Sequence, residues 1–273
     1  MRKILFIVMM VVISATCSAN KPSVTAAEGD ITIYFARHGK TLFNQFDRVQ
    51  GWADSPLTQE GILVAKYLGE GLRHVPFERF YTSDAGRQRE TLAIVLKQAG
   101  IVNYRSKELP GLREAFFGGF EGGFNAGMAN AMAPMLGLKD GAEVFKKMKA
   151  AELDVKELQD ALAEADPEGM AENYQQVKTR TRAALDAMVK EARASGEKAI
   201  IAVSSGTAIQ IMIAELTDNP QKNRPLPNAS VVKIIYRDGG YIVEEVGELK
   251  YVESGRRSIN KDNSQYLPTN PTV

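Results

Sequence analysis

The residues best suited to chemistry follow directly on a hydrophobic segment near the start of the chain. Residues 31–36 are β-branched and aromatic, and Arg37, His38 and Gly39 come immediately after them. Arginine presents a fork of N–H donors that fits a phosphate, and a neutral imidazole can attack phosphorus as a nucleophile. Glycine lets the backbone approach a bound anion closely. Because ligands bind at the carboxyl ends of strands in open α/β sheets, this turn is a candidate site for phosphoryl transfer.

Further polar segments follow in an order that identifies a family. Y-F-A-R-H-G-K-T-L-F-N at 34–44 is followed by Q-G-W-A-D-S-P-L-T-Q-E-G at 50–61. T-S-D-A-G-R-Q-R-E-T occupies 82–91, L-R-E-A-F-F-G-G-F-E-G occupies 112–122, and P-N-A-S occupies 227–230. These motifs resemble those of the histidine phosphatase superfamily, the phosphoglycerate mutase-like proteins. The resemblance covers about residues 30–250.

The resemblance implies a role for each matching residue. His38 would attack phosphorus and become a phosphohistidine, and Glu114 would protonate the leaving alkoxide and then activate water. The phosphoryl oxygens would be bound by further side chains, namely Arg37, Arg87, Asn44 and Thr41. Clustered cations stabilise the charge that such a group carries in the transition state. The expected ligand is a small phosphorylated substrate or inorganic phosphate, with no cofactor and no metal.

One position departs from the family pattern. The family has a second histidine after a late strand, and the corresponding stretch here is I-I-A-V-S-S-G-T-A-I-Q, which places Ser205 at that position. Serine has one rotatable donor and no charge. Losing one electrostatic contact of this kind costs a factor of about 10² to 10³ in rate.

The departure leaves two functional interpretations. In the first, Ser205 binds the phosphoryl group and the protein is a metal-independent phosphomonoester phosphatase. In the second, the pocket binds a phosphorylated ligand without productive hydrolysis. A phosphoglycerate mutase is less favoured, because an export signal would separate the protein from glycolytic intermediates.

Several of these residues also have structural interpretations. Arg37 could pair with a carboxylate at the sheet edge, and Glu114 could serve only as a salt-bridge partner. We expect Trp52 to pack the loop that carries it, and Arg89 and His74 to lie at the surface.

The elements that position these residues alternate between strands and helices. Strands are expected over 31–36, 77–82 and 198–203, and a hairpin over 231–246 turns at Asp238. Helices are expected from Thr58 as N-cap, over 89–100, over 172–194 and from Thr207. Such alternation predicts an α/β fold, a three-layer α/β/α arrangement with a mostly parallel sheet.

The middle of the chain has a different composition. Residues 118–171 are rich in Gly, Ala and Met, with helical spacing over 142–150 and 155–165. We interpret them as a helical cap inserted into a domain that covers residues 30–254, with the methionines as adaptable core filler. Residues 255–273 are polar and are expected to form a frayed tail.

The first residues have the pattern of an export signal. Two basic residues precede ten apolar ones at 4–13, and small residues follow up to Ala19. We expect residues 1–19 to be a signal peptide, with cleavage possible up to residue 27, or a lipoprotein anchor at Cys17. The working protein would be periplasmic or secreted, and would meet a membrane only if Cys17 carries lipid.

Composition narrows the remaining classes. The 273 residues carry 34 Lys and Arg against 33 Asp and Glu, which argues against a nucleic-acid partner. A single cysteine and two histidines exclude a disulfide framework and leave little for a zinc site. The composition carries no information on the oligomeric state.

Overall fold

A computed structural model describes residues 29–265 of the chain. Within that range six strands form one sheet: β1 Ile31–Arg37, β2 Arg79–Thr82, β3 Ser106–Glu108, β4 Ala199–Ser204, β5 Val231–Arg237 and β6 Gly240–Glu248. The helices are α1 Leu42–Gln45, α2 Gln59–Gly71, α3 Gly86–Gln98, α4 Asn125–Met132, α5 Gly141–Lys149, α6 Val155–Ala165, α7 Tyr174–Ser195, α8 Gly206–Ile213 and α9 Lys250–Gln265.

The sheet is mixed but mostly parallel, as predicted. Its order is β3-β2-β4-β1-β5-β6. The first four strands in that order are parallel, whereas β5 and β6 form an antiparallel hairpin at one edge. β1 and β4 therefore lie side by side at the centre, and their carboxyl ends bring His38 and Ser205 to the same edge of the sheet.

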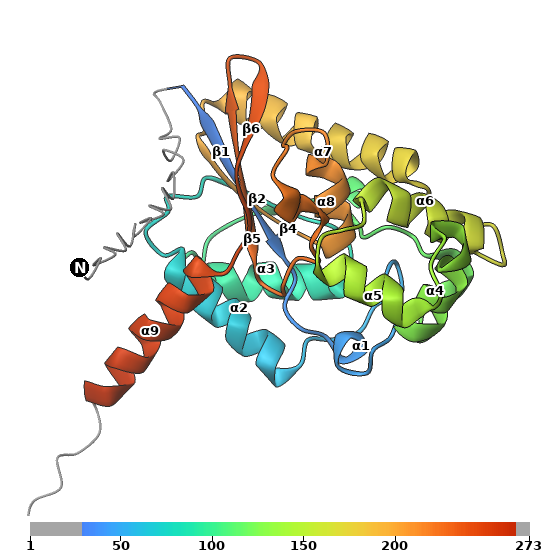
Figure 1. The fold of residues 1–273 in the computed structure, drawn as a ribbon. Helices are drawn as coiled ribbons and strands as arrows, with labels where there is room; N and C mark the ends of the chain where they lie inside the picture. The colour runs from blue at the N-terminus through green and yellow to red at the C-terminus, as the bar shows by residue number, and fades with distance from the viewer. Residues whose placement is uncertain (1–28, 266–273) are drawn as a thin grey trace, which may run out of the picture.

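Helices cover both faces of the sheet, which gives the expected three layers (Figure 1). Along β1, Ile31, Ile33 and Phe35 pack with α7 and α8 on one face. Ala36 packs with α2 and α3 on the other face. All six residues of β4 are buried, because this central strand is covered on both sides.

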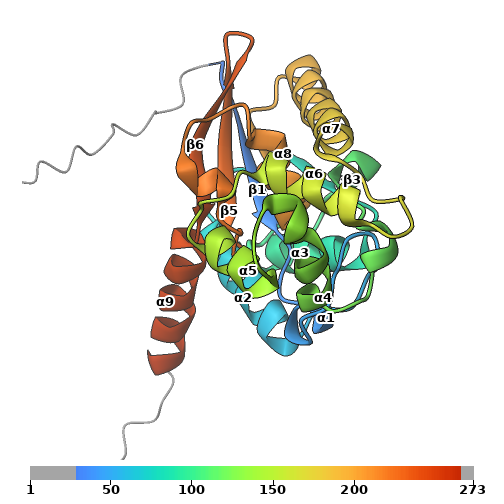
Figure 2. The same ribbon diagram turned by 45° about the vertical axis from the view of Figure 1, so that its right-hand side comes forward.

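The segment 118–171 forms a helical cap beside the sheet, where Figure 2 shows α4, α5 and α6 grouped together. These helices have a hydrophobic core of their own, which includes Met132, Val144 and Leu158. Ile211 of α8 joins the same core and links the cap to the central domain. The cap thus lies next to the helix that follows Ser205.

The expectation of a frayed C-terminal tail was wrong for residues 255–265, and residues 266–273 lie outside the described range. Instead of a frayed tail from residue 255, the structure has helix α9, which crosses α2 (Figure 1). A Cβ on Gly255 would lie 1.9 Å from the carbonyl oxygen of Tyr67, so the two helices cross in close contact there. The sequence did not indicate this helix, because it is polar and has no continuous apolar face. It is held in place by the close contact at Gly255 and by a few aromatic contacts, such as Tyr251 on Tyr34.

The predicted signal peptide, including Cys17, lies outside the described residues. Between residues 29 and 265, no helix is both long and apolar enough to span a bilayer.

Candidate active site

The turn after β1 is held by its neighbours on three sides. The backbone N–H of His38 donates to Ser204 O at 3.0 Å, which continues the β1–β4 ladder. The N–H of Gly39 donates to Thr91 Oγ1 of α3 at 3.0 Å. A Cβ on Gly39 would lie 2.6 Å from Gly61 O at the start of α2, so only glycine fits this approach. The nucleophile candidate therefore sits on a rigid turn.

His38 is poised as a neutral base. The side chain is 3% exposed, and Nδ1 lies 2.8 Å from Gly39 O. Because a carbonyl oxygen only accepts, Nδ1 carries the proton and Nε2 keeps its lone pair. Burial, followed by the charges of Arg87 and Arg37, holds the pKa of His38 well below its ordinary value. A neutral imidazole with a free Nε2 is the form that can attack phosphorus.

Two arginines act on this histidine, Arg87 fully buried and Arg37 partly buried. Arg37 donates through Nη1 to Leu226 O, and burial lowers its pKa, although it remains a cation. Arg87 donates to Gly51 O at 2.7 Å, Ala53 O at 3.1 Å and Asp54 Oδ1 at 2.9 Å. The Nε atoms of both arginines are buried and have no hydrogen-bond partner among residues 29–265. Buried donors of this kind are satisfied by a bound ion or by ordered water, and a phosphoryl group could supply the acceptor.

Ser205 has a polar neighbour that the sequence motif did not reveal. Its Oγ accepts from Gln88 Nε2 at 2.6 Å and lies 3.4 Å from Arg87 Nη2. Both residues are fully buried. A hydroxyl has two lone pairs and one hydrogen, so these two donors leave the hydroxyl hydrogen for another acceptor. The Oε1 atom of Gln88 is buried without a partner in the described part of the chain.

Glu114 lies at the N-terminus of α8. Its Oε1 accepts from Ala115 N at 2.9 Å and Ala208 N at 2.7 Å, and its Oε2 accepts from Thr207 N at 3.1 Å. The side chain is 7% exposed, and it acts electrostatically on Arg37. The carboxyl is thus bonded to backbone amides at the start of α8, and not only to a charged side chain.

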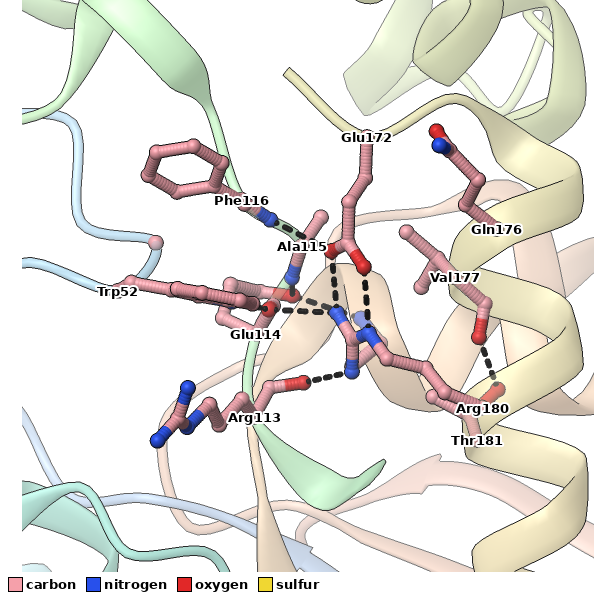
Figure 3. Close-up of polar contacts among 12 residues, drawn as sticks. Trp52, Arg113, Glu114, Ala115, Phe116, Glu172, Gln176, Val177, Arg180 and Thr181 are labelled. Atoms are coloured by element: carbon pink, nitrogen blue, oxygen red, sulfur yellow. Dashed lines mark hydrogen bonds and ion pairs between the residues drawn. The ribbon is translucent and has the colours of Figure 1, made fainter. Parts of the chain in front are cut away.

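Two residues, Arg180 of α7 and Glu172 just before that helix, hold the loop that carries Glu114 (Figure 3). Arg180 of α7 donates to Arg113 O at 2.7 Å and to Glu114 O at 2.7 Å. It also forms a two-pronged ion pair with Glu172, whose Oε2 accepts from Phe116 N at 2.9 Å. Sequence reasoning missed Arg180 and Glu172, because no local motif marks an arginine in the middle of a long helix.

Asn44 and Thr41 have capping roles. The two residues cap α1 reciprocally, and Thr41 also donates its hydroxyl hydrogen to Gln50 Oε1 at 2.5 Å. Thr41 therefore supports the loop in this structure, and its hydroxyl hydrogen is not free for phosphate. Asn44 Oδ1 accepts from Asn228 Nδ2 at 3.3 Å, and the same amide donates to His38 O at 3.0 Å. The segment 227–230 thus ties Asn44 to the nucleophile, and phosphate binding by Asn44 stays a prediction.

Trp52 is exposed and contacts the loop that carries Glu114. Its ring lies against Phe116, with centroids 4.8 Å apart and planes tilted by 37°, and its Nε1 donates to Glu114 O at 3.1 Å. Arg89 pairs with Glu108 at the surface, and His74 is exposed. Across the described residues, no three His, Cys, Asp or Glu side chains come together to hold a metal ion.

Comparison with known proteins gives consistent matches. A profile of the histidine phosphatase superfamily (branch 1) matches residues 33–143 and 135–248. The crystal structure of phosphoglycerate mutase from Bacillus anthracis str. Sterne is 37% identical, with a TM-score of 0.77 over 83% of this chain and 97% of that one. A Yersinia pestis (strain Pestoides F) protein named "Probable phosphoglycerate mutase GpmB" is 26% identical over 231 residues, which cover 82% of this chain and 95% of that protein.

The fold also occurs in phosphatases. A mycobacterial glucosyl-3-phosphoglycerate phosphatase is 22% identical, with a TM-score of 0.58 over 78% of this chain and 96% of that one. Proteins similar to this chain therefore include both mutases and phosphatases.

Proposed function

The chain belongs to the histidine phosphatase superfamily, and from that premise we propose that it hydrolyses phosphomonoesters through a phosphohistidine at His38. The observation that carries the proposal is the arrangement around this residue. A neutral buried imidazole lies in the field of Arg87, which is buried, and Arg37, which is partly buried, and the buried Nε atoms of both have no partner among residues 29–265. Such a site is arranged to receive a phosphoryl dianion.

The first step forms a phosphorus–nitrogen bond. The lone pair of His38 Nε2 attacks phosphorus, and the bond from phosphorus to the alcohol oxygen breaks. Arg37 and Arg87 stabilise the charge on the phosphoryl oxygens. A proton passes from Glu114 to the leaving alkoxide. Its Oε2 accepts only one amide N–H, from Thr207, and so keeps a lone pair that can carry that proton.

The second step regenerates the histidine. Water attacks phosphorus, Glu114 removes a proton from that water, and the phosphorus–nitrogen bond breaks. Inorganic phosphate leaves and His38 is again neutral. Because the arginines supply the positive charge, we expect the activity to persist in EDTA.

Labelling of the enzyme tests the proposal. The protein is mixed with p-nitrophenyl phosphate, quenched in alkaline detergent that preserves phosphohistidine, and analysed by mass spectrometry. We expect a phosphoryl group on His38, loss of label and of product in His38→Ala, and no effect of His74→Ala, which alters an exposed histidine. Turnover that is undiminished in His38→Ala would contradict the proposal.

The alternative is a phospho-ligand binding protein of the same fold. It is favoured by the uncharged Ser205 beside Arg87, where the family pattern has a histidine. Phosphate binding by calorimetry, with neither label on His38 nor turnover, would support this alternative.

We also propose that the protein works outside the cytoplasm. The proposal rests on the apolar run at 4–13 and the small residues that follow it. N-terminal sequencing of the protein purified from its own cells tests it: an intact Met1 would contradict export, and lipid on Cys17 would indicate anchoring.

A further inference from the structure

An apolar cavity of about 180 Å³ adjoins Glu114 and Arg37 of the proposed site. Arg37, Glu114 and Thr207 contribute to its wall, and the cap helices supply much of the rest. The cap side chains are almost all hydrophobic: Met128, Met132, Phe145, Met148, Leu158 and Leu162. Because the alcohol oxygen of the substrate would lie close to Glu114, the rest of the alcohol would extend into this cavity.

Two amide groups in the wall are already committed to backbone carbonyls, and Asn223 Oδ1 accepts from Val155 N at 3.2 Å. Gln159 Nε2 donates to Glu172 O, and Gln210 Nε2 donates to Lys222 O at 2.8 Å and Arg224 O at 3.0 Å. Among the lining residues, Arg37 is the single cation, and the proposed mechanism commits it to the phosphoryl group. A carboxylate or second phosphate on the substrate would lose its hydration here with no cation to receive it.

We infer that the substrate is a phosphomonoester of an apolar alcohol, with a hydrophobic group about the size of a phenyl ring or a branched alkyl chain. This inference rests on the proposed function and names its substrate class. The size follows from the volume, since an apolar cavity of about 150 Å³ is large enough to bind benzene. Methionines suit such a wall because their flexible side chains adapt to the shape of the ligand.

The cap thereby selects the alcohol, while the sheet edge binds the phosphate. Met128 and Met132 lie one helical turn apart on α4 and present one face, and Leu158 and Leu162 do the same on α6. Neither face carries a charged group into the cavity. The site is therefore unsuited to phosphoglycerate, although the chain is similar to phosphoglycerate mutases.

Steady-state kinetics with three substrates test the inference. Benzyl phosphate and glycerol 3-phosphate release alcohols of similar acidity, and 3-phosphoglycerate adds a carboxylate. We expect kcat/KM for benzyl phosphate to exceed the other two by a factor of about 10 to 100, the discrimination typical of a hydrophobic pocket. Equal values, or a preference for 3-phosphoglycerate, would overturn the inference while leaving the phosphatase proposal intact.

Binding measurements keep the test independent of turnover. Benzylphosphonate and phosphonoacetate differ in a phenyl group against a carboxylate, and neither can be hydrolysed. We expect calorimetry to show at least about tenfold tighter binding of benzylphosphonate. If no ester is hydrolysed but this difference is found, the proposed function fails and the specificity stands; equal or reversed affinities overturn the specificity.

Two cavity variants and one control complete the test. Met148→Lys places a cation in the wall and should cut the benzyl preference at least tenfold, whereas Met135→Lys, on an exposed side chain of the cap, should leave the preference unchanged. Phe145→Ala enlarges the cavity at a partly exposed position and should shift the preference toward naphthylmethyl phosphate. Unchanged substrate ratios in folded cavity variants would overturn the inference.

Discussion

At the scale of single residues, the serine that stands where the family pattern has a histidine is paired with a neighbouring glutamine. Gln88 Nε2 lies 2.6 Å from Ser205 Oγ, and both side chains are fully buried. The volume and the hydrogen bonds that an imidazole would need are therefore already taken by the glutamine. Ser205 and Gln88 form a unit, in which the amide occupies one lone pair of the hydroxyl and leaves its hydrogen for another acceptor.

This pairing predicts that Ser205→His alone will not increase activity. The larger ring would overpack a filled site, and we expect a loss of about 1–3 kcal/mol in the free energy of unfolding. Ser205→His combined with Gln88→Ala makes room for the ring and should restore stability and raise kcat/KM above that of Ser205→His.

The single variants Gln88→Ala and Ser205→Ala serve as controls for this experiment. Urea unfolding and kinetics with p-nitrophenyl phosphate provide the two measurements. A fully stable and more active Ser205→His protein would show that the glutamine does not hold the space.

The residue scale also shows what sequence reasoning can reach. His38, Arg37 and Arg87 stand in local motifs, so their types and order are sufficient to indicate the chemistry. The bond between Gln88 and Ser205 joins residues 117 positions apart, and no local pattern carries that information. Thr41 shows the opposite case, since its motif position suggested phosphate binding and its hydroxyl caps a helix.

At the scale of elements, α7 controls the loop that bears Glu114. Arg180 reaches from the helix to three carbonyl groups of that loop, on Gly111, Arg113 and Glu114. Glu172, just before α7, completes the clamp through Phe116 N (Figure 3). The position of the proposed acid is therefore set by a helix that does not itself contribute to the phosphate pocket.

Arg180→Lys should weaken this clamp. A lysine keeps the charge but cannot form the fork of hydrogen bonds that the guanidinium makes. We expect kcat to fall about tenfold with a smaller change in KM, because a misplaced acid affects the chemical step more than phosphate binding. Arg193→Lys, at an exposed position of the same helix, should leave both constants unchanged. An equal loss in both variants would assign the effect to helix stability.

Elements with strong local signals were predicted and those without were not. Helix α2 begins where predicted, because Thr58 caps it by accepting from Gly61 N. Helix α3 begins at Gly86, three residues before the predicted start. The start was misplaced because its N-cap residue, Ala85, has no capping side chain that the sequence could show. Strand β3 was missed, since its three residues are polar and exposed and only pairing with β2 defines it.

At the scale of the whole molecule, the site lies where three hydrophobic cores meet. One core lies under α7 and α8, one under α2 and α3, and one inside the cap. His38 is enclosed at this junction together with Arg37 and Arg87, so the fold holds cations around a group that can itself become charged. Global stability should therefore depend on the protonation of this residue.

The sign of that dependence follows from the pKa of His38, which folding lowers well below its ordinary value through burial and the two arginines. Above about pH 6.5 the residue is neutral in both the folded and unfolded states and contributes no pH dependence. Below that pH the unfolded chain binds a proton that the folded protein does not, so stability falls by up to about 1.4 kcal/mol per pH unit until the folded pKa is reached. Urea unfolding of the wild type and of His38→Gln at pH 7.5, 6.5, 5.5 and 4.5 isolates this contribution. We expect the wild type to lose stability relative to the variant as the pH falls, and a gain would mean that the folded protein holds His38 as a cation.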